Sequence, residues 1–299
     1  MIAAGWLWMV FTLLAAASQT ARNAMQRELT ATLGTVGATQ VRFLFGFPFA
    51  LASLAAVLIA TGYPLPVPML IYIPWVILGA GAQILATALM LMAMNDRSFV
   101  VTIAYIKTEA IQAALFGLLF LGDPLTLPIF VAIVIATAGV VLMSFKPGAR
   151  IEGGLRPTVL GLVAGAMFAL SAVGFRGAIL SLDHPNFVVG ATVTLAAGLV
   201  MQASLLTLYL ALRDRVVMMK ILRAWRPSLF AGFMGATASQ FWYLAFAITT
   251  VANVRTLALV EVLFAQAISF FIFRQATTPR EAFGMSLIVA GVALLIWVQ

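Results

Sequence analysis

Two stretches of the chain, Tyr105–Ser144 and Thr256–Trp297, follow the same plan and constrain the fold more than any other feature. Each holds an apolar run with a glutamate near its start, then a polar turn, then a second apolar run. Aligning the Ala-Gly-Val triplets that begin at Ala138 and Ala290 gives an offset of 152 residues (290 − 138). A whole two-run plan that recurs at one offset indicates an internal duplication.

The duplication extends beyond these stretches and includes charged residues. The offset of 152 places Glu109 on Glu261, and Arg22 recurs as Arg176 at an offset of 154. A charged side chain inside an apolar run is energetically expensive, so matched charges favour a shared origin of the two halves. The polar segment Lys146–Arg156 lies between the halves. We therefore expect one repeat over 1–148 and a second over 149–299.

The apolar runs are long enough to cross a bilayer. Hydrophobic residues make up 64% of the chain and charged residues only 9%, against about 25% charged residues in soluble domains. The runs lie at 3–24, 35–60, 69–94, 98–121, 127–145, 157–180, 187–212, 227–249, 253–274 and 280–298. Their lengths suit a hydrocarbon core of about 30 Å. This predicts an all-α integral membrane protein with ten transmembrane helices. Since five is odd, the second repeat is inverted, as in many secondary transporters.

The distribution of lysine and arginine predicts the orientation in the membrane. Connectors after odd-numbered runs hold 13 of these residues, against Arg176 and Arg255 after even-numbered runs. The 13 are Arg22, Arg27, Arg97, Lys146, Arg150, Arg156, Arg213, Arg215, Lys220, Arg223, Arg226, Arg274 and Arg280. Because positive loops stay in the cytoplasm, both termini are expected outside. The net charge of +8 is then a topological signal, and no nucleic-acid partner is expected.

Several function classes lack their chemical groups. The chain has no cysteine and one histidine, His184, so we expect no metal site, no cofactor and no cysteine nucleophile. An intramembrane enzyme would need a clustered catalytic set, and the matched acids are 152 residues apart. A channel fits the hydrophobicity but is not favoured by an inverted repeat. A solute carrier is the expected class, with a lipid-linked-group flippase as the alternative.

Charged residues inside the runs are the first candidates for substrate binding or coupling. Glu261 and Glu109 can bind a cationic group or carry a coupling proton, or each can form a structural ion pair. The possible partners of such pairs are Arg42, Lys107, Arg176 and Arg255. Arg42 can hold a substrate carboxylate or only a helix-packing salt bridge. Lys107 lies two residues from Glu109, on a different helix face, and is a further candidate.

Aromatic and amide side chains complete the candidate set. Trp242 and Tyr243 can stack on rings or cations if they face inward, although lipid-facing packing is the more common fate of such residues. Gln240 and Gln83 can hydrogen-bond amino and carboxyl groups. Neighbouring helical residues point about 100° apart, so one of the adjacent aromatics can face the interior.

Four features together resemble the drug/metabolite transporter superfamily, EamA type. They are Arg42-Phe43, the turn Gly122-Asp123-Pro124-Leu125-Thr126, the glutamates Glu109 and Glu261, and the triplets Ala138-Gly139-Val140 and Ala290-Gly291-Val292. The resemblance covers nearly the whole chain as two five-helix copies. It implies a monomeric multi-pass exporter or exchanger of small metabolites, such as amino acids or related amines, in the bacterial inner membrane.

The matched glutamates also predict an arrangement and a mechanism. The fourth and ninth helices should face one another beside a central cavity, around which the two halves rock in alternating access. Lys107 is expected to neutralise Glu109 locally, whereas the nearest base to Glu261 in sequence is Arg255, six positions away. Glu261 is therefore the favoured ligand or proton carrier, and Glu109 is expected to matter more for stability.

Overall fold

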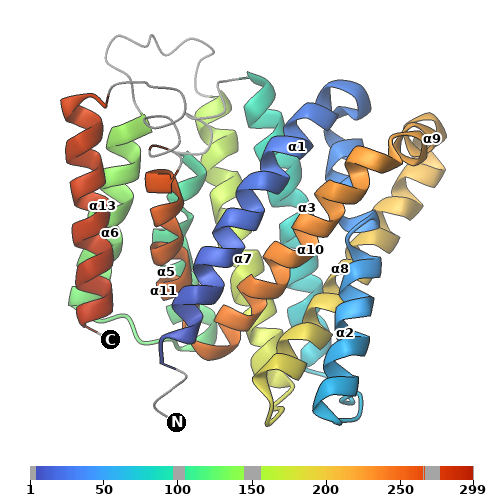
Figure 1. Cartoon of the computed structure of the whole chain (residues 1–299), viewed down its shortest axis with the longest axis horizontal. Helices are drawn as coiled ribbons and strands as arrows, with labels where there is room; N and C mark the ends of the chain where they lie inside the picture. Colours follow the sequence, from blue (N-terminus) through green and yellow to red (C-terminus); the bar gives the residue numbers. More distant parts are fainter. Residues whose placement is uncertain (1–4, 97–104, 145–155, 265, 267–276, 299) are drawn as a thin grey trace.

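The structure is a computed structural model that describes residues 5–96, 105–144, 156–264, 266 and 277–298. Within this part of the chain all regular structure is helical and no strand occurs (Figure 1). The longer helices are α1 (Leu7–Leu44), α2 (Phe47–Thr61), α3 (Tyr72–Asp96), α5 (Glu109–Leu121), α6 (Leu127–Ser144), α7 (Arg156–Ser181), α8 (Phe187–Arg213), α10 (Trp225–Ile248) and α13 (Pro279–Trp297). The shorter ones are α9 (Arg215–Arg223), α11 (Val251–Leu257) and the 3-10 helix η2 (Ala258–Val260).

Most apolar runs coincide with helices to within a few residues. The runs at 69–94, 157–180 and 280–298 correspond to α3, α7 and α13. The runs at 98–121 and 253–274 are described only in part, since 98–104, 265 and 267–274 lie outside the described residues. Most of the expected linker Lys146–Arg156, and with it the boundary between the two expected repeats, lies outside them too.

The first predicted helix extends further than expected, whereas the second begins where predicted. Helix α1 continues past residue 24 and breaks at Gly34, where φ is +68° and ψ is 175°. Its two helical segments are joined across this kink, and the second begins at residue 35, as the run at 35–60 predicts. Glycine tolerates such a backbone because it has no Cβ. Arg22 and Arg27, expected in a connector, therefore lie within α1. Arg22 is consequently inside the bundle and is only 1% exposed.

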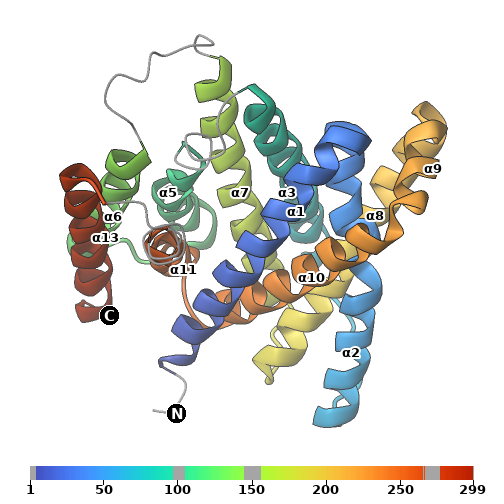
Figure 2. The same ribbon diagram turned by 45° about the horizontal axis from the view of Figure 1, so that its top comes forward.

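Three pairs of helices pack most extensively: α3 with α7, α1 with α10, and α6 with α13. The last pair, at the left of Figures 1 and 2, is held by small residues. A Cβ added at Gly139 would lie 2.6 Å from the carbonyl oxygen of Gly284, and one added at Gly291 would lie 2.6 Å from the backbone nitrogen of Ala136. The two matched triplets thus serve close backbone approach of the same two helices.

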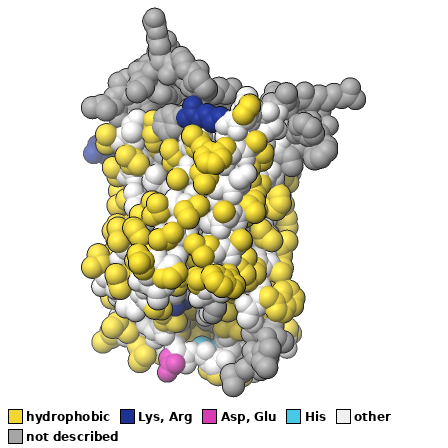
Figure 3. All heavy atoms as spheres, turned by 90° about the vertical axis from the view of Figure 1, so that its left-hand side faces the viewer, with side chains coloured by type: hydrophobic (Ala, Val, Ile, Leu, Met, Phe, Trp, Pro, Cys, Tyr) yellow, Lys and Arg dark blue, Asp and Glu magenta, His cyan; other side chains and the backbone are white. Residues whose placement is uncertain are grey.

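The outer surface is apolar around its middle. Figure 3 shows hydrophobic side chains covering the centre of the α6–α13 face, with Lys and Arg near its upper end. Among the described residues, five segments are long and apolar enough to cross a membrane by length and composition: Glu28–Thr61, Tyr72–Met94, Thr158–Ser181, Phe187–Arg213 and Pro279–Trp297. The two termini lie at one end of the molecule and α9 at the other (Figure 1). The chain is thus an all-α protein with the helices of a membrane protein.

Candidate functional site

Six charged side chains gather inside the bundle, which we call the central charge cluster. Its members are Arg22, Arg42, Lys107, Glu109, Arg255 and Glu261. All are buried except Glu261, whose side chain is still only 14% exposed. Such residues inside an apolar bundle are expensive and mark functional sites by default.

Interrupted helices position the cluster. Glu109 is the first residue of α5, and Lys107 precedes it across a turn at Thr108. Arg255 lies in the short helix α11, and Glu261 follows directly after η2. Helices α5 and α11 pack against each other (Figures 1 and 2). The charged segments from the two halves of the chain therefore meet in the interior.

Two ion pairs within the cluster cross between the halves. The Lys107 ammonium pairs with the Glu261 carboxylate, and their side chains are 5% and 14% exposed. Arg255 Nη1 lies 3.4 Å from Glu109 Oε1, with side-chain exposures of 7% and 6%. The expectation that Lys107 neutralises Glu109 is therefore wrong. The two point to different sides, and each carboxylate takes its cation from the other half of the chain.

Trp242 faces the interior and stacks against one of these cations. The Arg255 guanidinium carbon lies 4.6 Å from the Trp242 ring centroid and 5.4 Å from that of Phe246. The Trp242 indole N–H donates to Gln19 Oε1 at 3.1 Å. The ring face and the N–H group of this tryptophan thus both have partners in the interior, and the lipid-facing alternative does not apply to it. Tyr243 is also buried, with its ring 4.7 Å from that of Phe175.

Arg22 and Arg42 form no ion pair with any described carboxylate. Arg22 donates from Nε and Nη2 to Asn23 Oδ1, at 3.2 and 2.6 Å, and its Nη1 has no hydrogen-bond partner. Arg42 donates from Nη1 to the Thr87 hydroxyl at 3.2 Å, and its Nε has none. Both arginines are thus only partly satisfied by neutral groups.

The side-chain stems of these two arginines converge on α10. A Cβ added at Gly235 would lie 3.3 Å from Arg22 Cδ and 3.3 Å from Arg42 Cγ. Glycine at this position therefore leaves room for both side chains to pass the helix. Arg22 also interacts electrostatically with Arg42, Arg255 and Glu261.

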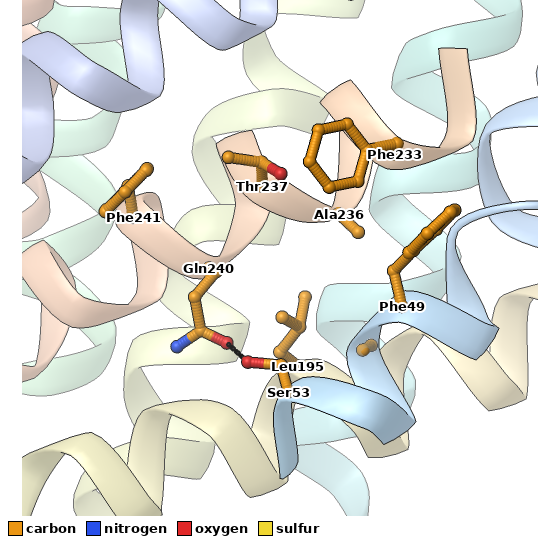
Figure 4. A pocket seen from close by; sticks show the side chains of 9 residues that line it. Phe49, Ser53, Leu195, Phe233, Ala236, Thr237, Gln240 and Phe241 are labelled. Atoms are coloured by element: carbon orange, nitrogen blue, oxygen red, sulfur yellow. Dashed lines mark hydrogen bonds between the residues drawn. The ribbon is translucent and has the colours of Figure 1, made fainter. Parts of the chain in front are cut away.

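The two amide candidates lie in different places. Gln83 accepts a hydrogen bond from Gln202 Nε2 at 2.9 Å. It lies one helical turn before Thr87, the residue that binds Arg42, and is therefore beside the cluster. Gln240 is elsewhere, accepting from the Ser53 hydroxyl at 3.2 Å and donating to Thr192 at 2.9 Å. It lines a separate, mainly apolar cavity of about 230 Å³ between α2, α8 and α10 (Figure 4). Gln240 is therefore not part of the charged site.

The space at the charges themselves is nearly closed. A cavity of about 20 Å³ is lined by Gln19, Asn23, Met90, Ile106 and Phe168 together with five of the charged residues. Such a volume suffices for about one water molecule. The charged side chains therefore leave little free space between them.

A third ion pair, whose side chains are each 12% exposed, connects three elements away from the cluster. Arg176 of α7 donates from Nη2 to Asp123 Oδ1 at 3.3 Å, in the turn between α5 and α6. Its Nη1 donates to the backbone carbonyls of Phe246, at 2.5 Å, and Thr249. These carbonyls belong to the end of α10, where helical partners are missing. Arg176, Asp123 and this helix end form one latch.

Four members of the cluster were predicted from the sequence, namely Glu109, Glu261, Lys107 and Arg42, whereas Arg22 and Arg255 were assigned only secondary roles. Arg22 was assigned to a connector because the first helix was expected to end early. Arg255 aligns with Ile103 at the expected repeat offset (255 − 152), so comparison of the two halves did not mark it. The absence of an acid near either arginine in sequence was the available signal.

No protein-family model and no curated protein matches the chain. A solved crystal structure, described only as that of a protein, superposes on 99% of this chain and 99% of its own with a TM-score of 0.73. The sequence identity is 15%, so this likeness concerns the fold alone.

Proposed function

We propose that the protein is a secondary active transporter of small metabolites, of the drug/metabolite transporter type, built as two inverted five-helix halves. The observation that carries this proposal is the pair of buried salt bridges, Lys107–Glu261 and Arg255–Glu109, that joins the halves at the centre of the bundle. Inverted-repeat transporters place their sites near the midplane between the repeats, where helices are interrupted. The short elements α11 and η2 supply such an interruption.

The pattern of helix packing supports the inverted arrangement. In the proposed repeat, α1 corresponds to α7 and α3 corresponds to α10. Exchanging the two halves therefore turns the α1–α10 contact into the α7–α3 contact, and both are extensive. The same exchange leaves the contacts of α6 with α13, α5 with α11, and α2 with α8 unchanged, because each joins two corresponding helices. A two-fold relation between halves produces this exchange. Rocking of the halves about the cluster would then open the cluster alternately to the two sides of the membrane. In this proposal the membrane is the bacterial inner membrane, and both termini lie outside.

The cross-half ion pairs suit such motion. Each pair is made of one group from either half, so relative movement of the halves changes its geometry directly. Groups that separate must find new partners, since a buried unpaired charge is strongly destabilising. A bound solute or proton can serve as that partner, which would couple occupancy of the site to the movement.

Counterflow in liposomes tests the proposal. The purified full-length protein is reconstituted into vesicles loaded with an unlabelled solute, and uptake of the labelled form is followed. The panel covers amino acids, nucleosides, quaternary amines and small organic acids. We expect saturable counterflow of at least one class, lost in Glu261→Gln and retained in Arg213→Gln, whose side chain is exposed.

Failure of every solute, with equal reconstitution of all variants, would refute the carrier. Transbilayer movement of a fluorescent lipid-linked substrate under the same conditions would instead assign the protein as a flippase. Flux that does not saturate and shows no counterflow would assign it as a channel.

A further inference from the structure

We infer that the ligand of the central charge cluster is a small soluble anion, whose carboxylate or phosphate oxygens are held by Arg22 and Arg42. This inference rests on the proposed transport function and names its substrate class. It starts from charge. The cluster contains four cations, Arg22, Arg42, Lys107 and Arg255, and two carboxylates, Glu109 and Glu261, which leaves an excess of two positive charges (4 − 2).

The excess resides on specific side chains. Lys107 and Arg255 are paired with the two carboxylates, whereas Arg22 and Arg42 meet only the neutral oxygens of Asn23 and Thr87 among the described residues. The two arginines are 1% and 2% exposed, so water does not screen them as it would at the surface. Uncompensated charges so deeply buried are strongly destabilising unless a counter-ion is supplied. The described part of the protein supplies none.

Hydrogen-bond donors without partners point the same way. Arg22 Nη1 and Arg42 Nε are buried and unsatisfied, and Arg22 lines the small cavity at the cluster. A guanidinium presents its N–H groups as a planar fork that matches the two oxygens of a carboxylate or phosphate. An anion seated between these arginines would satisfy both the orphan donors and the excess charge.

A cationic ligand lacks the equivalent support. Both carboxylates that could bind it already pair with a cation from the opposite half. Of the oxygens of these two carboxylates, Glu261 Oε2 is buried without a hydrogen-bond partner in the described structure, and the Glu261 carboxylate interacts electrostatically with Arg22. A cation entering here would raise the excess from two to three, whereas a dianion would cancel it. The charge balance therefore selects the sign of the ligand.

The enclosure of the cluster sets a condition for binding. The cavity of about 20 Å³ cannot hold a solute in this conformation. Binding thus requires the halves to separate at the cluster, with Gln19 and Asn23 of α1 as neutral hydrogen-bonding neighbours of the anion. The excess of two positive charges, carried by two guanidinium groups, fits small dicarboxylates and phosphate-bearing metabolites.

Thermal unfolding of the purified full-length protein in uncharged detergent tests the site without relying on transport. The probes are inorganic phosphate and succinate, with tetramethylammonium as the cation, all at matched ionic strength. We expect a concentration-dependent rise of the unfolding temperature with an anion and none with the cation. Arg22→Gln and Arg42→Gln should each raise the anion concentration that gives half of this temperature rise at least about ten-fold. This is the loss of affinity expected when one charge-assisted hydrogen bond is removed.

Variant stability without ligand gives an independent readout. Because an unpaired buried cation is unfavourable, Arg22→Gln is expected to unfold at a higher temperature than the wild type when no anion is present. The control Arg213→Gln removes an exposed arginine and should keep the wild-type response to anions. A merely structural Arg22 would give the opposite result, with lower stability and an unchanged anion response.

The outcomes separate this inference from the proposed function. Saturable counterflow of a cation that neither phosphate nor succinate inhibits would leave the carrier intact and overturn the anion site. Anion-specific stabilisation lost in Arg22→Gln, without transport of any solute, would support the anion site and refute the carrier. Stabilisation by phosphatidylglycerol but by neither soluble anion would overturn the inference in favour of a lipid headgroup.

Discussion

The cross-half pair Glu109–Arg255 predicts an asymmetric response to neutralisation. Both side chains are nearly buried, at 6% and 7% exposure, so solvent offers little compensation for a broken pair. Removing one partner of a buried ion pair costs about 3–5 kcal/mol. In this cluster the sign of the removed charge also matters, because cations already exceed carboxylates by two (4 − 2).

The substitution Glu109→Gln raises that excess to three, whereas Arg255→Gln lowers it to one. We expect Glu109→Gln to lower the free energy of unfolding by about 3–5 kcal/mol. Arg255→Gln should cost less, mainly the loss of its stacking on Trp242, about 2 kcal/mol for a desolvated contact. The double variant restores the excess of two and should be more stable than Glu109→Gln alone.

The assay is reversible unfolding in mixed micelles, followed by tryptophan fluorescence, for the wild type, both single variants and the double variant. The exposed acid Glu28 provides the matched control, since Glu28→Gln removes the same charge outside the cluster. Equal stabilities of Glu109→Gln and Glu28→Gln would refute the buried pair. A larger loss for Arg255→Gln than for Glu109→Gln would refute the excess of positive charge.

Four further predictions use other parts of the structure. In counterflow, Glu261→Gln should abolish transport and also lower stability, because it strands Lys107; wild-type flux would make the pair dispensable. Gly291→Ala should destabilise by about 1–3 kcal/mol by overpacking α13 on Ala132 and Ala136, measured by thermal unfolding against Gly81→Ala, whose added Cβ meets nothing within 4 Å. Asp123→Asn should cost about 1.5–3 kcal/mol by weakening the latch to Arg176, in the same assay, whereas Asp183→Asn at an exposed turn should be neutral. An outside-active reporter should work after Gln299 or between Asp183 and Pro185 and fail between Arg213 and Arg226; the reverse pattern would invert the orientation.

Much of the helical architecture could be predicted because apolar runs in a membrane protein have few alternatives. Lipid cannot hydrogen-bond the backbone, so a long apolar run forms a helix. The matched Ala-Gly-Val triplets could likewise be recognised, and the structure gives their physical reason in the close approach of α6 and α13. The break at Gly34 agrees with the expected gap between the first two runs. The continuation of the first helical segment past residue 24 was not predictable, because residues 25–33 carry the charges of a connector.

The pairing of charges could not be predicted because it depends on the register between two helices. Lys107 pairs with Glu261, and Glu109 pairs with Arg255. From Lys107 to Glu109 the residue number rises by two, whereas from Glu261 to Arg255, their respective partners, it falls by six. This opposite direction is expected for two neighbouring antiparallel segments. Sequence proximity suggested instead that Lys107 serves Glu109, although residues two apart in a helix point to different faces. The repeat offset was no guide either, since it maps Lys107 onto Leu259 (107 + 152). Matched positions in the two halves predict where the buried acids lie, but the base that neutralises each acid can come from any neighbouring helix, and only the packed structure selects one.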